Sequence, residues 1–155
     1  MPNPITKKGY DNLLKKIEEL KIEFEKMPEI IGTAREKGDL KENAEYHAAR
    51  ERQGMLQAEI GKLSGDFNES QVVDPKNLAP DIVTFGKEVK VQDLDSKNKL
   101  TFKIVGPAEA DISNNEISIL TPTAKGLLKH RVNDTANITV PAGTKKYKIL
   151  EINYI

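Results

Sequence analysis

Two stretches in the first half of the chain carry apolar residues at alternating spacings of three and four positions. This spacing is typical of a heptad seam, in which one stripe of an α-helix faces a partner helix. The first seam consists of Tyr10, Leu13, Ile17, Leu20, Phe24, Met27, Ile31 and Ala34. The second seam consists of Tyr46, Ala49, Gln53, Leu56, Ile60, Leu63 and Phe67. Each seam predicts one long helix.

The segment between the seams determines how the helices pair. Residues 35–45 contain Gly38, and their only apolar residues are Leu40 and Ala44. Helices joined by so short a polar segment pair by folding back, so residues 1–70 are predicted to form an antiparallel two-helix coiled-coil hairpin. The first helix should span about 25 residues and about 35 Å. Pro28 lies within it and removes a backbone hydrogen bond, so we expect a bend there.

The pattern changes after Leu63. Glycine, proline and asparagine interrupt the chain, and residues 71–80 are predicted to be a linker. Residues 81–155 carry short segments typical of β-strands and one of a short helix, 121–129, with Thr121 as N-cap and Pro122 at its first position. The predicted strands are 82–85, 88–94, 100–105, 116–120, 136–140 and 146–154, with a turn at 96–98 between the second and third. The second unit should therefore be a small antiparallel α+β domain.

Composition narrows the possible functions. The 155 residues include 24 basic and 24 acidic side chains, a balance that argues against binding nucleic acid or a membrane surface by bulk charge. The absence of cysteine excludes disulfides, thiolate zinc sites and thiol nucleophiles. No apolar run is long enough to span a bilayer, and the first residues lack the apolar stretch of a signal peptide. We therefore expect a soluble cytoplasmic protein without a membrane partner.

Candidate chemistry concentrates in Gly38–Tyr46, the tip of the predicted hairpin. Asp39 and Glu42 are three residues apart, so their carboxylates share a face if the backbone is helical. Carboxylates are ligands for Mg²⁺ and hold the metal ions of two-metal phosphodiester chemistry, but two of them make an incomplete site that needs a partner or substrate. The same spacing is also a capping box, with Asp39 as N-cap and Glu42 reaching back from N3. Spacing alone favours the cap, and the two roles are compatible.

Three of the four arginines, Arg35, Arg50 and Arg52, flank the tip. The guanidinium fork suits phosphate, and pairing within the helices is the alternative. Residues 35–52 contain five basic and five acidic side chains, so tight independent binding of RNA is not expected. Tyr46 could lie over a base or a phosphate, but it also begins the second seam.

The run Ala34–Glu51, which reads AREKGDLKENAEYHAARE, closely resembles the hairpin tip of the GreA/GreB family of bacterial transcript cleavage factors. The resemblance extends over the whole chain. Its further matches are Thr6-Lys7-Lys8-Gly9, Thr121-Pro122, Gly126-Leu127-Leu128, Pro141-Ala142-Gly143 and Tyr147 to Ile152. Two positions where the family usually has glycine hold His130 and Asn133, and we expect Asn133 to keep a turn at positive φ.

The resemblance implies a function. In this family the hairpin enters the secondary channel of RNA polymerase, and a C-terminal domain of FKBP-like fold docks at the channel rim. Asp39 and Glu42 would help to hold a Mg²⁺ ion shared with the polymerase, which then cleaves its backtracked RNA and frees a new 3′ end. Asn43 would support an acid, and Thr121-Pro122 would contact the rim. The chain would be a monomer, would not be an enzyme by itself and would not bind Mg²⁺ stably alone.

Three other functions remain open. A channel-binding inhibitor would share the architecture, although the presence of both Asp39 and Glu42 argues against it. The implied FKBP-like fold raises a prolyl isomerase or chaperone, which the low aromatic content of 5% and the absence of tryptophan disfavour. In a plain coiled-coil adaptor the tip sequence would be arbitrary.

Overall fold

The computed structural model describes residues 2–39 and 42–155; Leu40 and Lys41, inside the predicted tip, lie outside the described residues. The chain forms two compact units. One is Asp11–Asn68, and the other combines the segment that ends at Tyr10 with Glu69–Ile155. The prediction places residues 1–70 in the hairpin, whereas in the structure the residues before Asp11 belong to the C-terminal unit.

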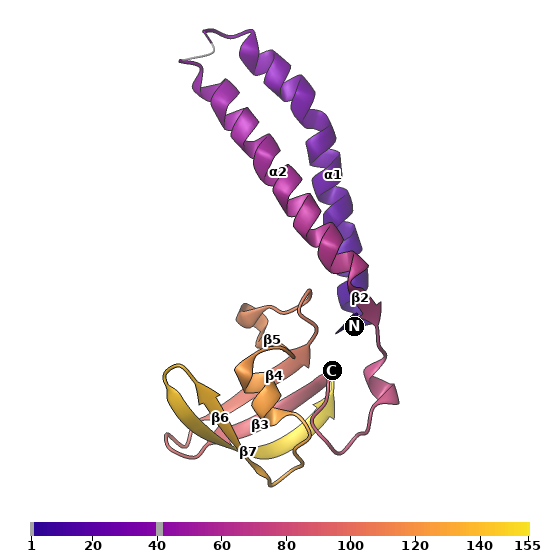
Figure 1. Cartoon of the computed structure of the whole chain (residues 1–155), viewed down its shortest axis with the longest axis vertical. Coiled ribbons are helices and arrows are strands. Elements are labelled where there is room, and N and C mark those ends of the chain that lie inside the picture. The colour runs from indigo at the N-terminus through magenta and orange to yellow at the C-terminus, as the bar shows by residue number, and fades with distance from the viewer. Residues whose placement is uncertain (1, 40–41) are drawn as a thin grey trace. The chain divides into compact units, whose positions relative to one another are not determined.

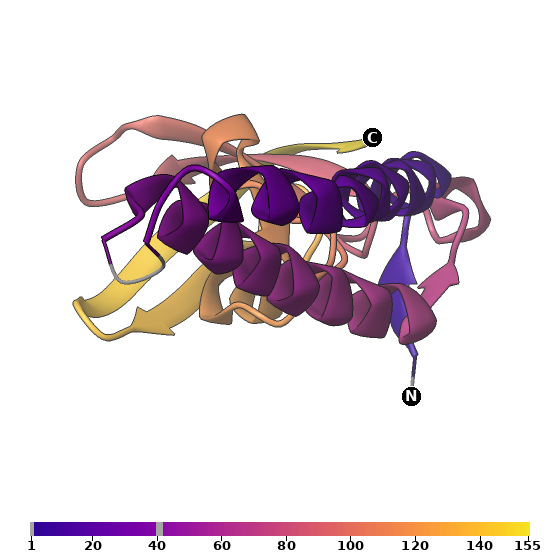
Figure 2. The same ribbon diagram turned by 90° about the horizontal axis from the view of Figure 1, so that it is seen from above.

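The helical unit is an antiparallel hairpin of α1 (Lys7–Arg35) and α2 (Ala44–Asn68), which lie side by side in both views (Figures 1 and 2). Both predicted seams are confirmed, since every member is buried or half-buried. The buried core of the pair consists of Leu20, Met27, Ile31, Ala49 and Leu56. None of the helices in the described ranges is long and apolar enough to cross a membrane.

Pro28 lies inside α1 without ending it. The ribbon of α1 bends in its C-terminal half, the half that contains Pro28 (Figure 1). A proline inside a helix removes one hydrogen bond and crowds the preceding turn, which accounts for a bend rather than a break. The helix is longer than expected, at 29 residues, because its first turn starts before the seam.

The C-terminal unit contains a five-stranded sheet in the order β5-β4-β3-β7-β6 (Figure 1). Its strands are β3 (Lys87–Asp93), β4 (Lys99–Val105), β5 (Glu116–Ser118), β6 (Thr135–Val140) and β7 (Gly143–Tyr154). Helix α3 (Pro122–Leu127) packs its buried residues Ala124 and Leu127 into the same apolar core as the inner residues of the sheet. Two short 3₁₀ helices, η1 (Pro75–Asn77) and η2 (Ile112–Asn114), complete the unit. The α+β prediction is confirmed.

The structure differs from the prediction for this unit in two details and agrees with it in one. Asn133 has a φ of 76°, which confirms its expected turn. The sheet is not wholly antiparallel, because β5 runs parallel to β4 after a connection that contains η2. Ile82–Phe85 is not a strand: Ile82 makes an isolated bridge with Arg131, and the chain then turns at Gly86, which has a φ of 79°.

The predicted linker is an ordered part of the C-terminal unit. Strand β1 (Asn3–Ile5) pairs in parallel with β2 (Ser70–Val72), so the segment after the hairpin begins in a two-stranded sheet. Farther on, the Tyr154 hydroxyl donates a hydrogen bond to the Leu78 carbonyl at 2.8 Å. Strands of three residues are too short to show a period, which is why the sequence did not predict β1 and β2.

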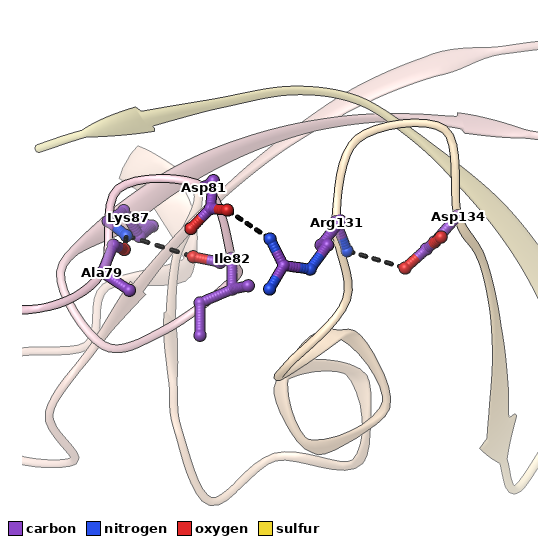
Figure 3. Close-up of polar contacts among 6 residues, drawn as sticks. All are labelled: Ala79, Asp81, Ile82, Lys87, Arg131 and Asp134. Carbon is purple, nitrogen blue, oxygen red and sulfur yellow. Dashed lines mark hydrogen bonds and ion pairs between the residues drawn. The ribbon is translucent and has the colours of Figure 1, made fainter.

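A buried lysine holds the next part of this connection. The side chain of Lys87 lies on the inner side of β3, and its ammonium group donates hydrogen bonds to the carbonyls of Ala79 and Ile82 (Figure 3). It also lies 4.8 Å from the centroid of the Tyr154 ring. Burial lowers the pKa of Lys87, and the nearby Asp81 carboxylate opposes this shift. Asp81 itself pairs with Arg131 (Figure 3). Lys87 therefore ties residues 79–82 to the sheet.

Replacing Lys87 with methionine should lower the free energy of unfolding by about 1–2 kcal/mol. Two carbonyls lose a charged donor, but the cost of burying an ammonium group is also removed, so the net loss is smaller than two charged hydrogen bonds would give. Lys90→Met, on the exposed face of the same strand, should change stability by less than about 0.5 kcal/mol. Urea denaturation of both variants measures the difference; equal stabilities would contradict the role of Lys87.

Candidate functional site: the hairpin tip

The tip joins the end of α1 to the start of α2. A short turn follows Arg35, and the Glu42 N–H donates to the Asp39 carbonyl at 3.2 Å. Because α2 begins at Ala44, Asp39 and Glu42 both precede the helix, and both are exposed. The capping-box prediction for this pair is wrong. The N-cap is Asn43, whose Oδ1 accepts the Tyr46 N–H at 3.0 Å; asparagine caps a helix as well as aspartate does.

Asn43 connects the two helices through one buried side chain. Its Nδ2 donates to the carbonyl of Ala34 in the last turn of α1, while its Oδ1 caps α2. The Tyr46 N–H has no intrahelical acceptor, and the Ala34 carbonyl, near the end of α1, also accepts the Lys37 N–H at 3.1 Å. Asn43 was expected to support an acid. In the structure it fixes the backbone on either side of the loop that carries Asp39 and Glu42.

An open pocket of about 410 Å³ lies at the tip. It is lined by Lys37, Gly38, Asp39, Glu42, Asn43, Ala44 and Glu45. Of its three acids, Glu45 pairs with Lys37 at 3.1 Å. Oxygen ligands suit a hard cation such as Mg²⁺, but the exposed pair Asp39 and Glu42 supplies too few for an octahedron. In the described ranges no group of three or more His, Cys, Asp or Glu residues could hold a metal ion.

Arg35 and Tyr46 form a contact beside the pocket. The Arg35 guanidinium donates to the Tyr46 hydroxyl at 3.5 Å, and its central carbon lies 5.5 Å from the centroid of the ring. This hydrogen bond lowers the pKa of Tyr46. Tyr46 also packs against the core of the hairpin, which confirms its place in the second seam. The contact joins the last residue of α1 to the first turn of α2.

The other two arginines lie farther along α2. Arg52 pairs with Glu23 of α1 through two hydrogen bonds, from Nε at 2.9 Å and from a terminal nitrogen at 2.8 Å. Its hydrogen bond to the carboxylate lowers the pKa of Glu23. Pairing within the helices is the alternative to phosphate binding for the arginines. Arg52 is paired, but its partner belongs to the other helix. Arg50 is exposed on α2.

Thr121 and Pro122 lie in the C-terminal unit, at the start of α3. The Thr121 hydroxyl accepts the Ala124 N–H at 3.2 Å and donates to the Ser118 carbonyl at 2.8 Å. The predicted cap is therefore confirmed. Pro122 is exposed, and Leu120 is 54% exposed. These residues form a small exposed surface at the start of α3.

The fold and the tip define a class of protein: a two-unit factor in which a mixed-sheet domain carries a coiled-coil hairpin with two exposed carboxylates at its end. Comparison with known families agrees. Residues 3–72 match the family model "Transcription elongation factor, N-terminal", and residues 78–154 match "Transcription elongation factor, GreA/GreB, C-term". The chain belongs to the GreA/GreB family of transcription elongation factors.

Individual relatives match the chain over nearly its full length. The transcription elongation factor GreA of Pelobacter propionicus is 42% identical over 152 residues, which cover 97% of this chain and 96% of that protein. The corresponding factor of Trichlorobacter lovleyi is 43% identical over 152 residues, with the same coverage. That of Acinetobacter baumannii is 41% identical over 154 residues, or 98% of each chain. Both units of this chain therefore have counterparts in these relatives.

Replacing Asn43 with alanine should lower the free energy of unfolding of the hairpin by about 1–2 kcal/mol, because the cap of α2 and the bond to the end of α1 are both lost. Asn43→Asp keeps the cap but loses the donor, so it should fall between alanine and wild type. Asp39→Ala is the matched control: alanine cannot cap a helix, yet stability should change by less than about 0.5 kcal/mol because Asp39 is exposed and precedes the capping residue. Denaturation followed by circular dichroism gives the order; a loss in Asp39→Ala equal to that in Asn43→Ala would restore Asp39 as the cap.

Acidification should weaken the hairpin through Glu23. Its pKa is lower in the folded protein than in the unfolded chain, so its contribution is fully present above its ordinary value of 4.5 and is lost as pH falls through the folded value. Stability measured between about pH 6 and about pH 3 should therefore fall less steeply in Glu23→Gln than in wild type. Glu25→Gln, an exposed neighbour, is the control, and identical slopes for wild type and Glu23→Gln would rule out this contribution.

Proposed function

We propose that this elongation factor inserts its hairpin tip into the secondary channel of RNA polymerase and stimulates the polymerase to cleave backtracked RNA. The observation that carries the proposal is the placement of Asp39 and Glu42. Both are exposed in the loop between two long helices, and Asn43 ties the helix ends on either side of that loop. A narrow coiled coil that ends in two carboxylates suits a channel that leads to a metal-dependent active site.

The incomplete ligand set at the tip favours shared chemistry over an independent enzyme. Asp39 and Glu42 would hold a Mg²⁺ ion together with ligands from the polymerase. When bound, such an ion lowers the pKa of a coordinated water and stabilises the charge that develops on the phosphodiester. The contribution of this chain is to present two carboxylates and to keep the loop that carries them in place. Affinity of the isolated factor for Mg²⁺ should accordingly be low.

The charges around the tip favour a polymerase that holds the RNA 3′ end itself. Two of the cations near the tip have protein partners, since Arg35 lies over Tyr46 and Lys37 pairs with Glu45. Arg52 is paired with Glu23. The exposed Arg50 is the arginine that we propose for contact with the displaced RNA. A tip whose charges pair among themselves enters a nucleic-acid channel without trapping RNA on its own.

The C-terminal unit would dock at the channel rim through the surface at the start of α3. Thr121 fixes the turn, and Pro122 and Leu120 present exposed apolar atoms beside it. Exposed apolar groups that lie next to one another are one feature of surfaces that bind proteins, and they are the reason to propose this surface. A monomeric factor that binds with both units, the hairpin in the channel and this surface at the rim, accounts for the family matches in both parts of the chain.

Backtracked elongation complexes with labelled RNA test the proposal. Wild type should accelerate cleavage. Asp39→Asn or Glu42→Gln should reduce the cleavage rate by at least about tenfold, because losing a residue that only supports a metal ligand already costs about that much. Glu51→Gln, an exposed carboxylate on α2, is the control and should cleave like wild type.

Each variant should still compete with wild type for the polymerase, since its hairpin stays folded. Wild type that leaves the RNA intact but blocks nucleotide addition would instead identify a channel-binding inhibitor. If the variants at Asp39 and Glu42 stimulate cleavage as well as wild type does, the proposed metal-binding role of the tip is wrong.

A further inference from the structure

The start of α1 is held by Glu109, a residue 103 positions after Thr6 in the sequence. Thr6 is the N-cap of α1: its hydroxyl accepts the Gly9 N–H at 3.0 Å, and its carbonyl accepts the Tyr10 N–H at 2.9 Å. The Glu109 carboxylate accepts the Thr6 N–H at 2.8 Å and the Thr6 hydroxyl at 2.5 Å. The same carboxylate accepts the Gly106 N–H at 3.2 Å, within its own loop after β4.

Two glycines make room for this contact. A Cβ atom on Gly106 would overlap the backbone carbonyl oxygen of Pro4, so this position requires glycine for the two segments to approach. A Cβ atom on Gly9 would overlap Oε1 of Glu109, so a larger residue there would push the carboxylate away from Thr6. The motif Thr6-Lys7-Lys8-Gly9 acquires a physical reason: threonine supplies the hydroxyl, and glycine leaves space for the carboxylate.

Capping alone does not require Glu109. Thr6 already provides the local cap, and a threonine at this position is sufficient for an ordinary helix. Glu109 adds a link across 103 residues of sequence, with a charged acceptor at the positive end of the helix dipole. The first turn of α1 consequently belongs to the C-terminal unit, and the same helix continues without interruption into the hairpin.

We propose that Glu109 is a positioning residue for transcript cleavage. By holding Thr6, Glu109 keeps the first turn of α1 in the C-terminal unit, the unit proposed to dock at the polymerase rim. Because α1 continues from this turn to the tip, binding of the C-terminal unit to the rim would restrict the position of the tip. This inference rests on the proposed function. It predicts that loss of the contact lowers the maximal cleavage rate without weakening the binding of the factor.

The test uses the full chain with two changes that break the contact differently. Glu109→Gln removes the charge, and Gly9→Ala displaces the carboxylate although alanine is normally favourable in a helix. Thr6→Ser, which keeps the hydroxyl, and Glu69→Gln, which removes an exposed carboxylate elsewhere in the same unit, are the matched controls. Cleavage is measured over a range of factor concentrations, and amide hydrogen exchange of Gly9 and Tyr10 is measured on the free factor.

In Glu109→Gln and Gly9→Ala, exchange at Gly9 and Tyr10 should accelerate about tenfold, the factor for one charge-assisted hydrogen bond. The maximal cleavage rate should fall by a similar factor, while the factor concentration at half-maximal rate changes less than about twofold. Both controls should match wild type.

The outcomes separate the two proposals. Faster exchange with an unchanged cleavage rate would reduce Glu109 to a structural cap and overturn the positioning role, and so would unchanged exchange. Wild type that fails to stimulate cleavage would overturn the proposed function as well, and the exchange data would then decide on the Glu109 contact alone.

Discussion

The apolar seam between α1 and α2 is the interaction on which the function of this chain depends. Only one stripe of each helix is buried, so the core of the hairpin is thin: a single cluster of buried residues with partly buried neighbours. A pair of helices with so little buried surface is stable along its length but frays at its ends, where backbone groups lose their partners. The candidate site lies at one of these ends, and the first turn of α1, which belongs to the C-terminal unit, lies at the other.

The chain meets this constraint with polar side chains placed at both ends of the hairpin. At the tip, Asn43 satisfies backbone groups of α1 and α2 together. At the root, Thr6 and Glu109 do the same for the first turn of α1. Between them, Arg52 and Glu23 join the helices at the surface. The middle of the hairpin is held by apolar contacts and its two ends by hydrogen bonds, so single substitutions at the ends have effects out of proportion to their buried area.

The sequence predicted the fold where periodicity was long, and it missed what depends on single polar contacts. Both seams, α3 with its Thr121 cap, and five of the six predicted strands of the sheet follow from spacing and turn residues. The cap of α2 was assigned to Asp39 because Asp39 and Glu42 fit the capping box, although Asn43 is an equally good cap and lies next to the first helical residue. For Lys87 a signal existed: it shares the inward register of Val89 and Val91. For Glu109 there was none, since its partner is 103 residues away.

The parallel pairing of β1 with β2 sets how the hairpin is built into the chain. Parallel neighbours cannot be joined by a tight turn and need a long crossover, and here everything between Ile5 and Ser70 serves as that crossover. The hairpin is thus an insertion between β1 and β2, and the pairing of these two strands does not depend on the length of the hairpin. Removing or adding one heptad in each helix would change its length by about 10 Å and leave the pairing of the strands intact. The length of the hairpin and the fold of the domain can therefore change independently in such a chain, so that one scaffold can carry hairpins of different length.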